Sequence, residues 1–230
     1  VVSIFVNPLQ FAPHEDFSAY PRTFEQDAAL CEAAGVDILF CPQVTDLYPK
    51  DFQTRVIGGE LTSKYCGQTR PTFFNGVLTV VHILFQMVRP DMGFWGEKDF
   101  QQLFLVKKMV EDFKIPIKII GMPIIREESG LAMSSRNAYL APEQREEATC
   151  LFRAILAVSE AAKCGERNIE ALLKIARSQI SLEIDYLHLV SVKTLESLTG
   201  LLEEPARLLV AAYSNGSPRV RLIDNGEVLL

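Results

Sequence analysis

The chain has 230 residues, of which 48% are hydrophobic and 23% are charged. That is enough apolar material for one large globular domain or for two unequal ones. The 29 acidic residues outnumber the 23 Lys and Arg residues, which gives a net charge of -6. Because a nucleic-acid-binding surface usually requires a basic face, and the sequence contains no Lys/Arg cluster, we expect no nucleic-acid partner.

The sequence also lacks the patterns typical of a membrane span or a metal site. Its apolar runs are far shorter than the ~20 residues of a membrane-spanning helix, so we expect no membrane partner. The five cysteines stand singly, without C-x-x-C spacing, which is typical of a reduced, cytoplasmic protein. His14, which falls in a polar loop, His82 and His188 are not spaced for a metal site or a catalytic triad, and we expect no metal held by protein ligands.

The start of the chain reads as a strand–helix–strand unit. The β-rich residues at 1–6 and 36–41 form the expected strands. Thr23, with Gln26 three residues later, predicts a capping box at the start of the intervening helix, and Gly35 predicts its end.

Helices and strands continue to alternate as far as residue 125. The expected elements are a loop at 48–70 with at most a short strand near 54–57, and an apolar helix at 76–88. A short strand at 92–95, a helix capped by Asp99 at 100–113 and a β-rich stretch at 115–125 follow. Such alternation predicts an α/β fold with a Rossmann-like, doubly wound parallel sheet over residues 1–125.

The remainder of the chain, residues 126–230, has a different pattern. We expect a long helix at 142–163 and a second helix at 169–181. Three strands are expected after them, at 185–191, 206–213 and 219–223. Asn215-Gly216 supplies a hairpin-type turn. We therefore expect a smaller α+β C-terminal domain.

Polar segments follow three of the expected strands, at Asn7–Gln10, Gly96–Asp99 and Arg126–Arg136. Ligands of doubly wound sheets bind beyond the carboxyl ends of the strands, so we expect these segments to meet at one edge. Gly96–Asp99 places backbone N–H groups and the positive end of a helix above the sheet, and Lys98 adds a full charge, which together suit a phosphate. The alternative is a capped surface turn with solvated charges.

The other polar side chains suit the same kind of ligand. Ser134, Ser135 and Arg136 offer two hydroxyls and a guanidinium, and Arg can bind two phosphate oxygens at once. The amides of Gln10 and Gln102 both donate and accept hydrogen bonds, which suits a neutral hydroxyl or a carboxylate-bearing substrate. Each of these residues also has an ordinary interpretation, as part of a polar loop or an exposed helix face.

Five segments, in the same order, resemble the pantothenate synthetase (pantoate–β-alanine ligase) family. They are V-N-P-L-Q-F at 6–11, Y-P-R-T at 20–23, G-E-K-D-F-Q-Q-L at 96–103, G-L-A-M-S-S-R-N at 130–137 and L-I-D-N at 222–225. The resemblance implies a nucleotidyltransferase-type Rossmann-like domain, a smaller C-terminal lid domain that closes over it, and a homodimer.

The resemblance also implies a ligase that uses ATP. Pantoate and ATP, accompanied by Mg²⁺, form pantoyl adenylate and pyrophosphate, and β-alanine then attacks the adenylate to give pantothenate and AMP. By resemblance, Gln10 and Gln102 bind pantoate, and Gln10 also contacts β-alanine. The residues implied at the ATP site are Gly96, Glu97, Lys98, Asp99, Ile125, Met133, Ser134, Ser135 and Arg136, among which Lys98, Ser134, Ser135 and Arg136 are the expected catalytic residues.

The chain departs from the family pattern in two places. It has no His-x-Gly-His segment, and the resemblance begins at the family's second strand, so we expect the preceding strand, loop and helix to be missing from this sequence. Phe73 stands where many members have His. Two alternatives stay open: a related nucleotidyltransferase with a phosphorylated acceptor, and a non-catalytic or impaired form that binds ATP and pantoate.

Overall fold

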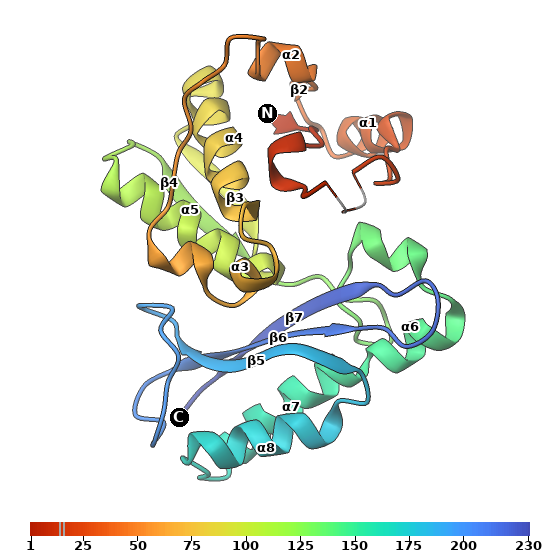
Figure 1. Ribbon diagram of the computed structural model, residues 1–230, viewed down its shortest axis with the longest axis vertical. Coiled ribbons are helices and arrows are strands. Elements are labelled where there is room, and N and C mark those ends of the chain that lie inside the picture. The colour runs from red at the N-terminus through yellow and green to blue at the C-terminus, as the bar shows by residue number, and fades with distance from the viewer. Residues whose placement is uncertain (14, 16) are drawn as a thin grey trace. The chain divides into compact units, whose positions relative to one another are not determined.

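The computed structural model describes residues 1–13, 15 and 17–230 (Figure 1). His14, which was expected in a polar loop, and Asp16 lie outside the described residues. The chain divides into two compact units, Val1–Gly93 with Leu105–Ile120, and Phe94–Phe104 with Gly121–Leu230. The domain boundary at residue 125 stays a prediction.

Strands and helices alternate through the first part of the chain, as predicted. They are β1 (Val2–Ser3), α1 (Phe24–Ala33), β2 (Leu39–Phe40), α2 (Val44–Leu47), α3 (Cys66–Thr69), α4 (Phe73–Val88), β3 (Met92–Gly96), α5 (Phe100–Asp112) and β4 (Lys118–Met122). β1 pairs with β2 in parallel, with Val2 opposite Leu39, and β3 pairs with β4. Both β1 and β2 are shorter than the predicted strands, because their paired register covers only two residues of each.

Helix α1 begins and ends where the sequence predicted, but its predicted capping box is wrong. The Thr23 side chain makes no capping hydrogen bond to the backbone of the first turn, which a capping box requires. Its hydroxyl donates instead to the Asp27 carboxylate, one turn into the helix, at 3.2 Å. Gly35 has φ of +73°, the left-handed conformation that ends many helices.

Helix α4 is the apolar helix predicted for this region, and it begins three residues earlier than expected. Its buried side chains include Phe74, Val77, Val81 and Phe85, which recur at helical spacing along one face. Residues 54–57, all of them described, form no strand. The loop is instead attached to α4 by side chains, since the backbone N–H of Val56 donates to Thr79 Oγ1 at 3.0 Å.

The turn between β3 and α5 differs in detail from the prediction. Residues Glu97–Asp99 form a 3₁₀ turn that runs directly into α5, and Gly96 caps the turn. Asp99 is therefore inside the helical segment, at the end of its first turn, and is not its cap.

The C-terminal part contains two helices where one long helix was predicted. Its elements are α6 (Pro142–Ala148), α7 (Cys150–Lys163), α8 (Ile169–Gln179), β5 (Glu183–Ser191), β6 (Ala206–Tyr213) and β7 (Arg221–Val228). The break lies at Thr149, whose backbone N–H and hydroxyl both donate to the Glu146 carbonyl, at 3.1 and 2.6 Å. A Thr side chain that bonds to the preceding turn disturbs a helix in this way.

Strands β5, β6 and β7 form an antiparallel sheet in which β6 is central. Helices α7 and α8 lie side by side against one face of this sheet (Figure 1). Leu208, Val210 and Leu222 lie on that face and are at most 5% exposed, and burial of each contributes about 1.5–3 kcal/mol. β7 continues five residues beyond its predicted end, because Val228 still pairs with Ala206.

Among the described residues, no helix is both long enough and apolar enough to cross a membrane.

Candidate active site

The turn after β3 has the geometry of an anion site. Gly96 has extended backbone angles, and the Glu97–Asp99 turn and α5 then present the first N–H groups of a helical segment. A Cβ added to Gly96 would meet no atom of the described residues within 4 Å. Packing therefore does not require this glycine, and its backbone is open to a ligand.

Two polar side chains stand near the start of this helical segment. Lys98 is 19% exposed, and its Nζ lies 3.6 Å from Asp99 Oδ2. That separation is longer than a hydrogen bond, so the ammonium can donate to a phosphate without first breaking a strong ion pair. Gln102 is half-buried in the first turn of α5.

A hairpin-like loop over residues 126–132 brings together Ile125 and Met133, two residues of the expected ATP site. The Met133 N–H donates to the Ile125 carbonyl at 3.0 Å, and both side chains are more than half exposed. Gly130, with φ of +91°, makes the tight turn of this loop. A Cβ there would come within 2.5 Å of the Phe152 ring, so glycine is required for packing as well as for conformation.

The Ser134–Arg136 segment follows the loop as a second helical start. Ser134 caps a 3₁₀ turn over Ser135–Tyr139, and its Oγ accepts from the Arg136 N–H at 3.3 Å. Asn137 is buried behind the turn, where its amide donates to the Ala132 carbonyl and to the Glu127 carboxylate at 3.1 and 2.8 Å. The backbone that carries Ser135 and Arg136 is thus fixed by these hydrogen bonds.

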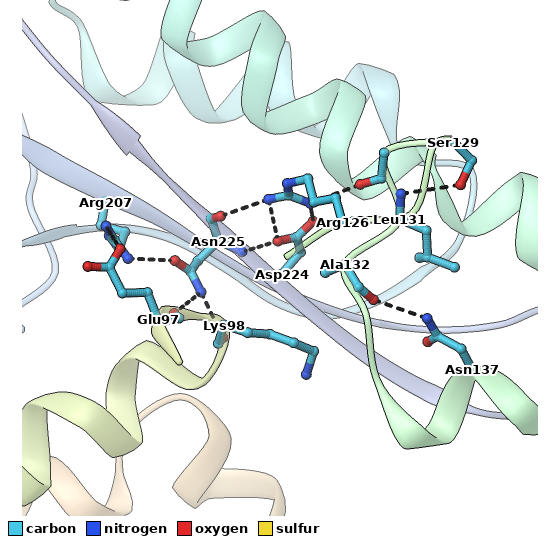
Figure 2. A network of polar contacts seen from close by, with 11 residues as sticks. Glu97, Lys98, Arg126, Ser129, Leu131, Ala132, Asn137, Arg207, Asp224 and Asn225 are labelled. Carbon is cyan, nitrogen blue, oxygen red and sulfur yellow. Dashed lines mark hydrogen bonds and ion pairs between the residues drawn. The ribbon is translucent and has the colours of Figure 1, made fainter. Parts of the chain in front are cut away.

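The turn after β3 and the loop that precedes Ser134 are both attached to strand β7, through its residues Asn225 and Asp224 (Figure 2). The Asn225 amide donates to the carbonyls of Glu97 and Lys98 at 2.9 and 2.8 Å. Asp224 accepts two hydrogen bonds from Arg126, at 2.7 and 2.9 Å. The structure therefore places Gly96–Asp99, Gln102, Ile125 and Met133–Arg136 in one compact unit.

Arg207 of β6 completes the network around the 97–98 turn. It is 4% exposed and donates to Asn225 Oδ1 at 2.9 Å, to Glu97 at 2.9 Å and to Glu227 at 3.1 Å. Its guanidinium also lies 4.2 Å from the centre of the Phe100 ring. A buried charge that is paired and stacked in this way holds its neighbours in defined positions.

Gln10 lies in the other compact unit, at the end of a 3₁₀ turn over Pro8–Gln10. Asn7, only 2% exposed, fixes this turn: its amide donates to the Gly76 carbonyl at 3.0 Å and to Gln10 Oε1 at 3.2 Å. The Tyr48 hydroxyl donates to Asn7 Oδ1 at 2.8 Å. Burial raises the pKa of Tyr48 to about 12, so the phenol stays protonated and remains a donor.

Arg70 anchors the same turn from the other side. It donates to the Gln10 carbonyl at 3.0 Å and makes two short hydrogen bonds to Glu15, at 2.6 and 2.7 Å. Its guanidinium lies 3.9 Å from the centre of the Phe73 ring. Phe73 is therefore a packing partner of Arg70.

Sequence reasoning missed Arg207 and gave no role to Asp224 and Asn225, although both lie in the L-I-D-N segment at 222–225. A weak signal exists for Arg207, because it is the single charged residue of the otherwise apolar strand A-R-L-L-V-A-A-Y at 206–213. Such residues are almost never fully buried unless they are paired. The pattern could have predicted buried partners, but not which residues these are.

The carboxylates of the site do not form a protein cage for a metal. Within the described part of the chain, no group of three or more His, Cys, Asp and Glu side chains could hold a metal ion. Mg²⁺ often binds through substrate phosphates and water with only one or two carboxylates. A metal ion held in that way would need no such group of protein ligands.

Comparison with known proteins gives one consistent family. The family model described as pantoate-beta-alanine ligase matches residues 1–227. Pantothenate synthetase of Trichlorobacter lovleyi is 48% identical over 229 residues, which cover 98% of this chain and 80% of that protein. Pantothenate synthetase 1 of Bradyrhizobium diazoefficiens is 46% identical over 227 residues, covering 98% of this chain and 79% of that protein.

Solved structures agree with the sequence comparisons. The crystal structure of pantothenate synthetase from Thermus thermophilus has a TM-score of 0.93 and 45% identity, covering 99% of this chain and 83% of that one. The pantoate-beta-alanine ligase of Francisella tularensis, complexed with beta-gamma ATP and beta-alanine, has a TM-score of 0.75 and 35% identity, covering 97% and 77% of the two chains. The predicted α/β fold, with a nucleotidyltransferase-type first part and a smaller C-terminal antiparallel sheet, is confirmed. The chain belongs to the pantoate–β-alanine ligase family.

Proposed function

We propose that the chain catalyses the ATP-dependent condensation of pantoate with β-alanine, which yields pantothenate, AMP and pyrophosphate. Family membership supports the reaction as a whole. The observation that carries its assignment to this site is the pair of helical starts at Glu97–Asp99 and Ser135–Tyr139. The first start, and the loop that leads to the second, are anchored to one strand. Two such starts offer separate groups of N–H donors to a polyphosphate.

In the first step, a carboxylate oxygen of pantoate attacks the α-phosphorus of ATP. The new P–O bond forms as the bond to the β-phosphate oxygen breaks, and pyrophosphate leaves. Negative charge grows on the α-phosphate oxygens and on the leaving group, and we assign its stabilisation to Lys98, Ser134, Ser135 and Arg136. These residues require no covalent intermediate with the protein, and most of the acceleration then comes from holding pantoate beside ATP.

In the second step, the amine of β-alanine attacks the acyl carbon of pantoyl adenylate. The C–O bond to AMP breaks, the amine loses a proton, and pantothenate and AMP are released. We assign pantoate binding to Gln10 and Gln102, because their amides can bind its hydroxyls and carboxylate without a change of charge. Gln10 is also the proposed contact for β-alanine. Asn7 and Arg70 hold the Gln10 turn for this purpose.

Mg²⁺ is proposed to arrive with the triphosphate of ATP and to neutralise part of its charge. When bound, it would be held mainly by phosphate oxygens and water, as is usual for Mg²⁺. The Lys98 ammonium is assigned to the phosphate charge that the metal leaves uncompensated, and Asp99 stays assigned to the ATP site beside it.

The family resemblance also supports a homodimer, which sedimentation velocity can test directly. All five cysteines are free thiols, which is the state expected in the reducing cytoplasm. We therefore propose a cytoplasmic location, which cell fractionation with an antibody can check.

The comparisons do not favour either alternative. A nucleotidyltransferase that acts on a phosphorylated acceptor would need extra cations for the acceptor phosphate, whereas the proposed substrate contacts Gln10 and Gln102 are neutral. A non-catalytic module would not need Lys98 and Arg136, each of which is carried by an ordered turn in this chain.

The experiment that tests the proposal is a pyrophosphate-release assay with ATP, with and without pantoate. We expect release only when pantoate is present. Lys98→Ala should slow it by about 100-fold, which corresponds to ~3 kcal/mol of lost transition-state stabilisation. Lys108→Ala is the matched control, because Lys108 is exposed and pairs only locally with Glu111 and Asp112 among the described residues. Release that does not depend on pantoate, or an unchanged rate in Lys98→Ala, would contradict the assignment.

A further inference from the structure

We propose that Asp224 and Asn225 form a two-sided clamp that positions both phosphate-binding turns of the active site. This inference rests on the proposed function, because it concerns how the residues assigned to ATP are held. Neither residue is proposed to touch ATP, so both are positioning residues.

Asn225 holds the turn that carries Lys98. One amide nitrogen donates to the backbone carbonyls of Glu97 and Lys98, at 2.9 and 2.8 Å, so both of its protons are used. The amide oxygen accepts from Arg207 at 2.9 Å, and Arg207 in turn binds the Glu97 carboxylate at 2.9 Å. The carbonyl and the carboxylate of Glu97 are thus fixed by one connected network.

Asp224 holds the loop that leads to Ser134 and Arg136. Its carboxylate binds the Arg126 guanidinium through two hydrogen bonds, and the same guanidinium donates to the Gly130 carbonyl at 3.0 Å. Arg126 also lies 3.9 Å from the centre of the Phe152 ring, so it is held on its flat face as well. A bidentate Arg–carboxylate pair gives defined geometry in addition to energy.

The strand itself explains how neighbouring residues can serve two turns. Successive side chains of a β-strand point to opposite faces. Asp224 shares a face with Gly226, whose added Cβ would come within 2.2 Å of Ile155 in α7. Asn225 shares the other face with Glu227, which also contacts Arg207. One rigid strand therefore supports one turn on each side.

The burial of the clamp makes it specific. Asp224 and Asn225 are 4% and 2% exposed, and a buried polar group that loses its partner is costly. Moving either turn away from these partners would break buried hydrogen bonds and would therefore cost free energy. Their backbone positions, and with them the position of Lys98, are set before ATP arrives, which is the preorganisation that electrostatic catalysis requires.

Asn225→Asp is the sharpest single test, because it keeps the size and the acceptor for Arg207 while removing both N–H donors. Measured in the full chain, it should lower kcat for pantoate-dependent pyrophosphate release by about tenfold to 100-fold, with little change in KM for pantoate. Deuterium exchange should increase in peptides that cover residues 94–104. Asn168→Asp is the matched control: Asn168 is an N-cap whose acceptor oxygen Asp retains, and it should leave both readouts unchanged.

A double-mutant cycle distinguishes positioning from a general loss of structure. If Asn225 acts through Lys98, then adding Asn225→Asp to Lys98→Ala should lower the rate by less than about twofold more. Multiplicative losses, or a kcat and an exchange pattern like the parent's, would overturn the proposal. If Asn225→Asp does not fold, as judged by circular dichroism, Arg126→Lys tests the other arm and should increase exchange at 125–137.

The same experiments separate this inference from the proposed function. A parent protein with normal turnover and an Asn225→Asp variant equal to it would overturn the clamp alone. A parent protein without pantoate-dependent release would overturn the proposed function, and the clamp's catalytic role with it. In that case, exchange at 94–104 would still report whether Asn225 holds the turn.

Discussion

Gly76 offers the most direct test of how the Gln10 turn is built. Gly76 lies in helix α4, and a Cβ added there would lie 2.3 Å from the Leu9 carbonyl oxygen and 2.8 Å from the Gln10 nitrogen. Both are backbone atoms, so no side chain can rotate out of the way. The turn would have to move by about 1 Å to restore an ordinary contact.

The cost of Gly76→Ala can be worked out from competing terms. Overpacking against a fixed backbone costs about 1–3 kcal/mol. Displacement also weakens the Asn7–Gly76 hydrogen bond, a loss of about 0.5–1.5 kcal/mol. Alanine returns up to about 1 kcal/mol of helix propensity. The net expectation is a destabilisation of about 1–3 kcal/mol.

The assay is urea unfolding, paired with measurement of KM for pantoate. Gly76→Ala should lower the unfolding midpoint without changing the slope, and it should raise KM because the displaced turn carries Gln10. Gly59→Ala is the matched control, because a Cβ at Gly59 meets no described atom within 4 Å and its φ of -77° suits alanine. A Gly76→Ala protein as stable as the parent, with unchanged KM, would refute this account of the turn.

Three further predictions concern single side chains. Gln102→Ala should raise KM for pantoate and leave ATP affinity nearly unchanged; equal losses for both substrates would show a purely structural role. Burial lowers the pKa of His188, so the unfolded chain binds that proton more tightly, and stability should fall as pH drops below 6.5 towards the lower folded pKa. A His188→Gln variant should lose less stability in this range, as urea unfolding at several pH values would reveal. Because burial raises the pKa of Tyr48 to about 12 from 10.0, Tyr48→Phe should remove a phenol that titrates near 12 from an ultraviolet pH titration of the folded protein. Loss of a phenol that titrates near 10 would contradict this.

The polar turns could be predicted from the sequence because their signals are local. Gly96 and Lys98 sit where a short strand gives way to a helix pattern, and the structure has a strand, a 3₁₀ turn and a helix there. Ser134 precedes a helical start and caps it. In both cases the residues that define the feature lie within a few positions of one another, so the pattern and the structure agree.

The supports of those turns could not be predicted, because they depend on contacts between distant residues. Asn225 binds backbone carbonyls that lie 127 and 128 positions earlier in the chain. Two further predictions were wrong because of local side-chain hydrogen bonds. The Thr23 hydroxyl binds Asp27 where a capping box was expected, and Thr149 interrupts a helix pattern that looked continuous.

The proposed reaction passes through pantoyl adenylate, and isotope transfer is the most direct test of this intermediate. Pantoate labelled with ¹⁸O in its carboxylate is incubated with ATP and β-alanine, and the AMP is analysed by mass spectrometry. Because the attacking carboxylate oxygen stays on phosphorus when the amine displaces AMP, the account predicts one ¹⁸O atom in each AMP. Unlabelled AMP would contradict this intermediate, and so would the formation of ADP and phosphate in place of AMP and pyrophosphate.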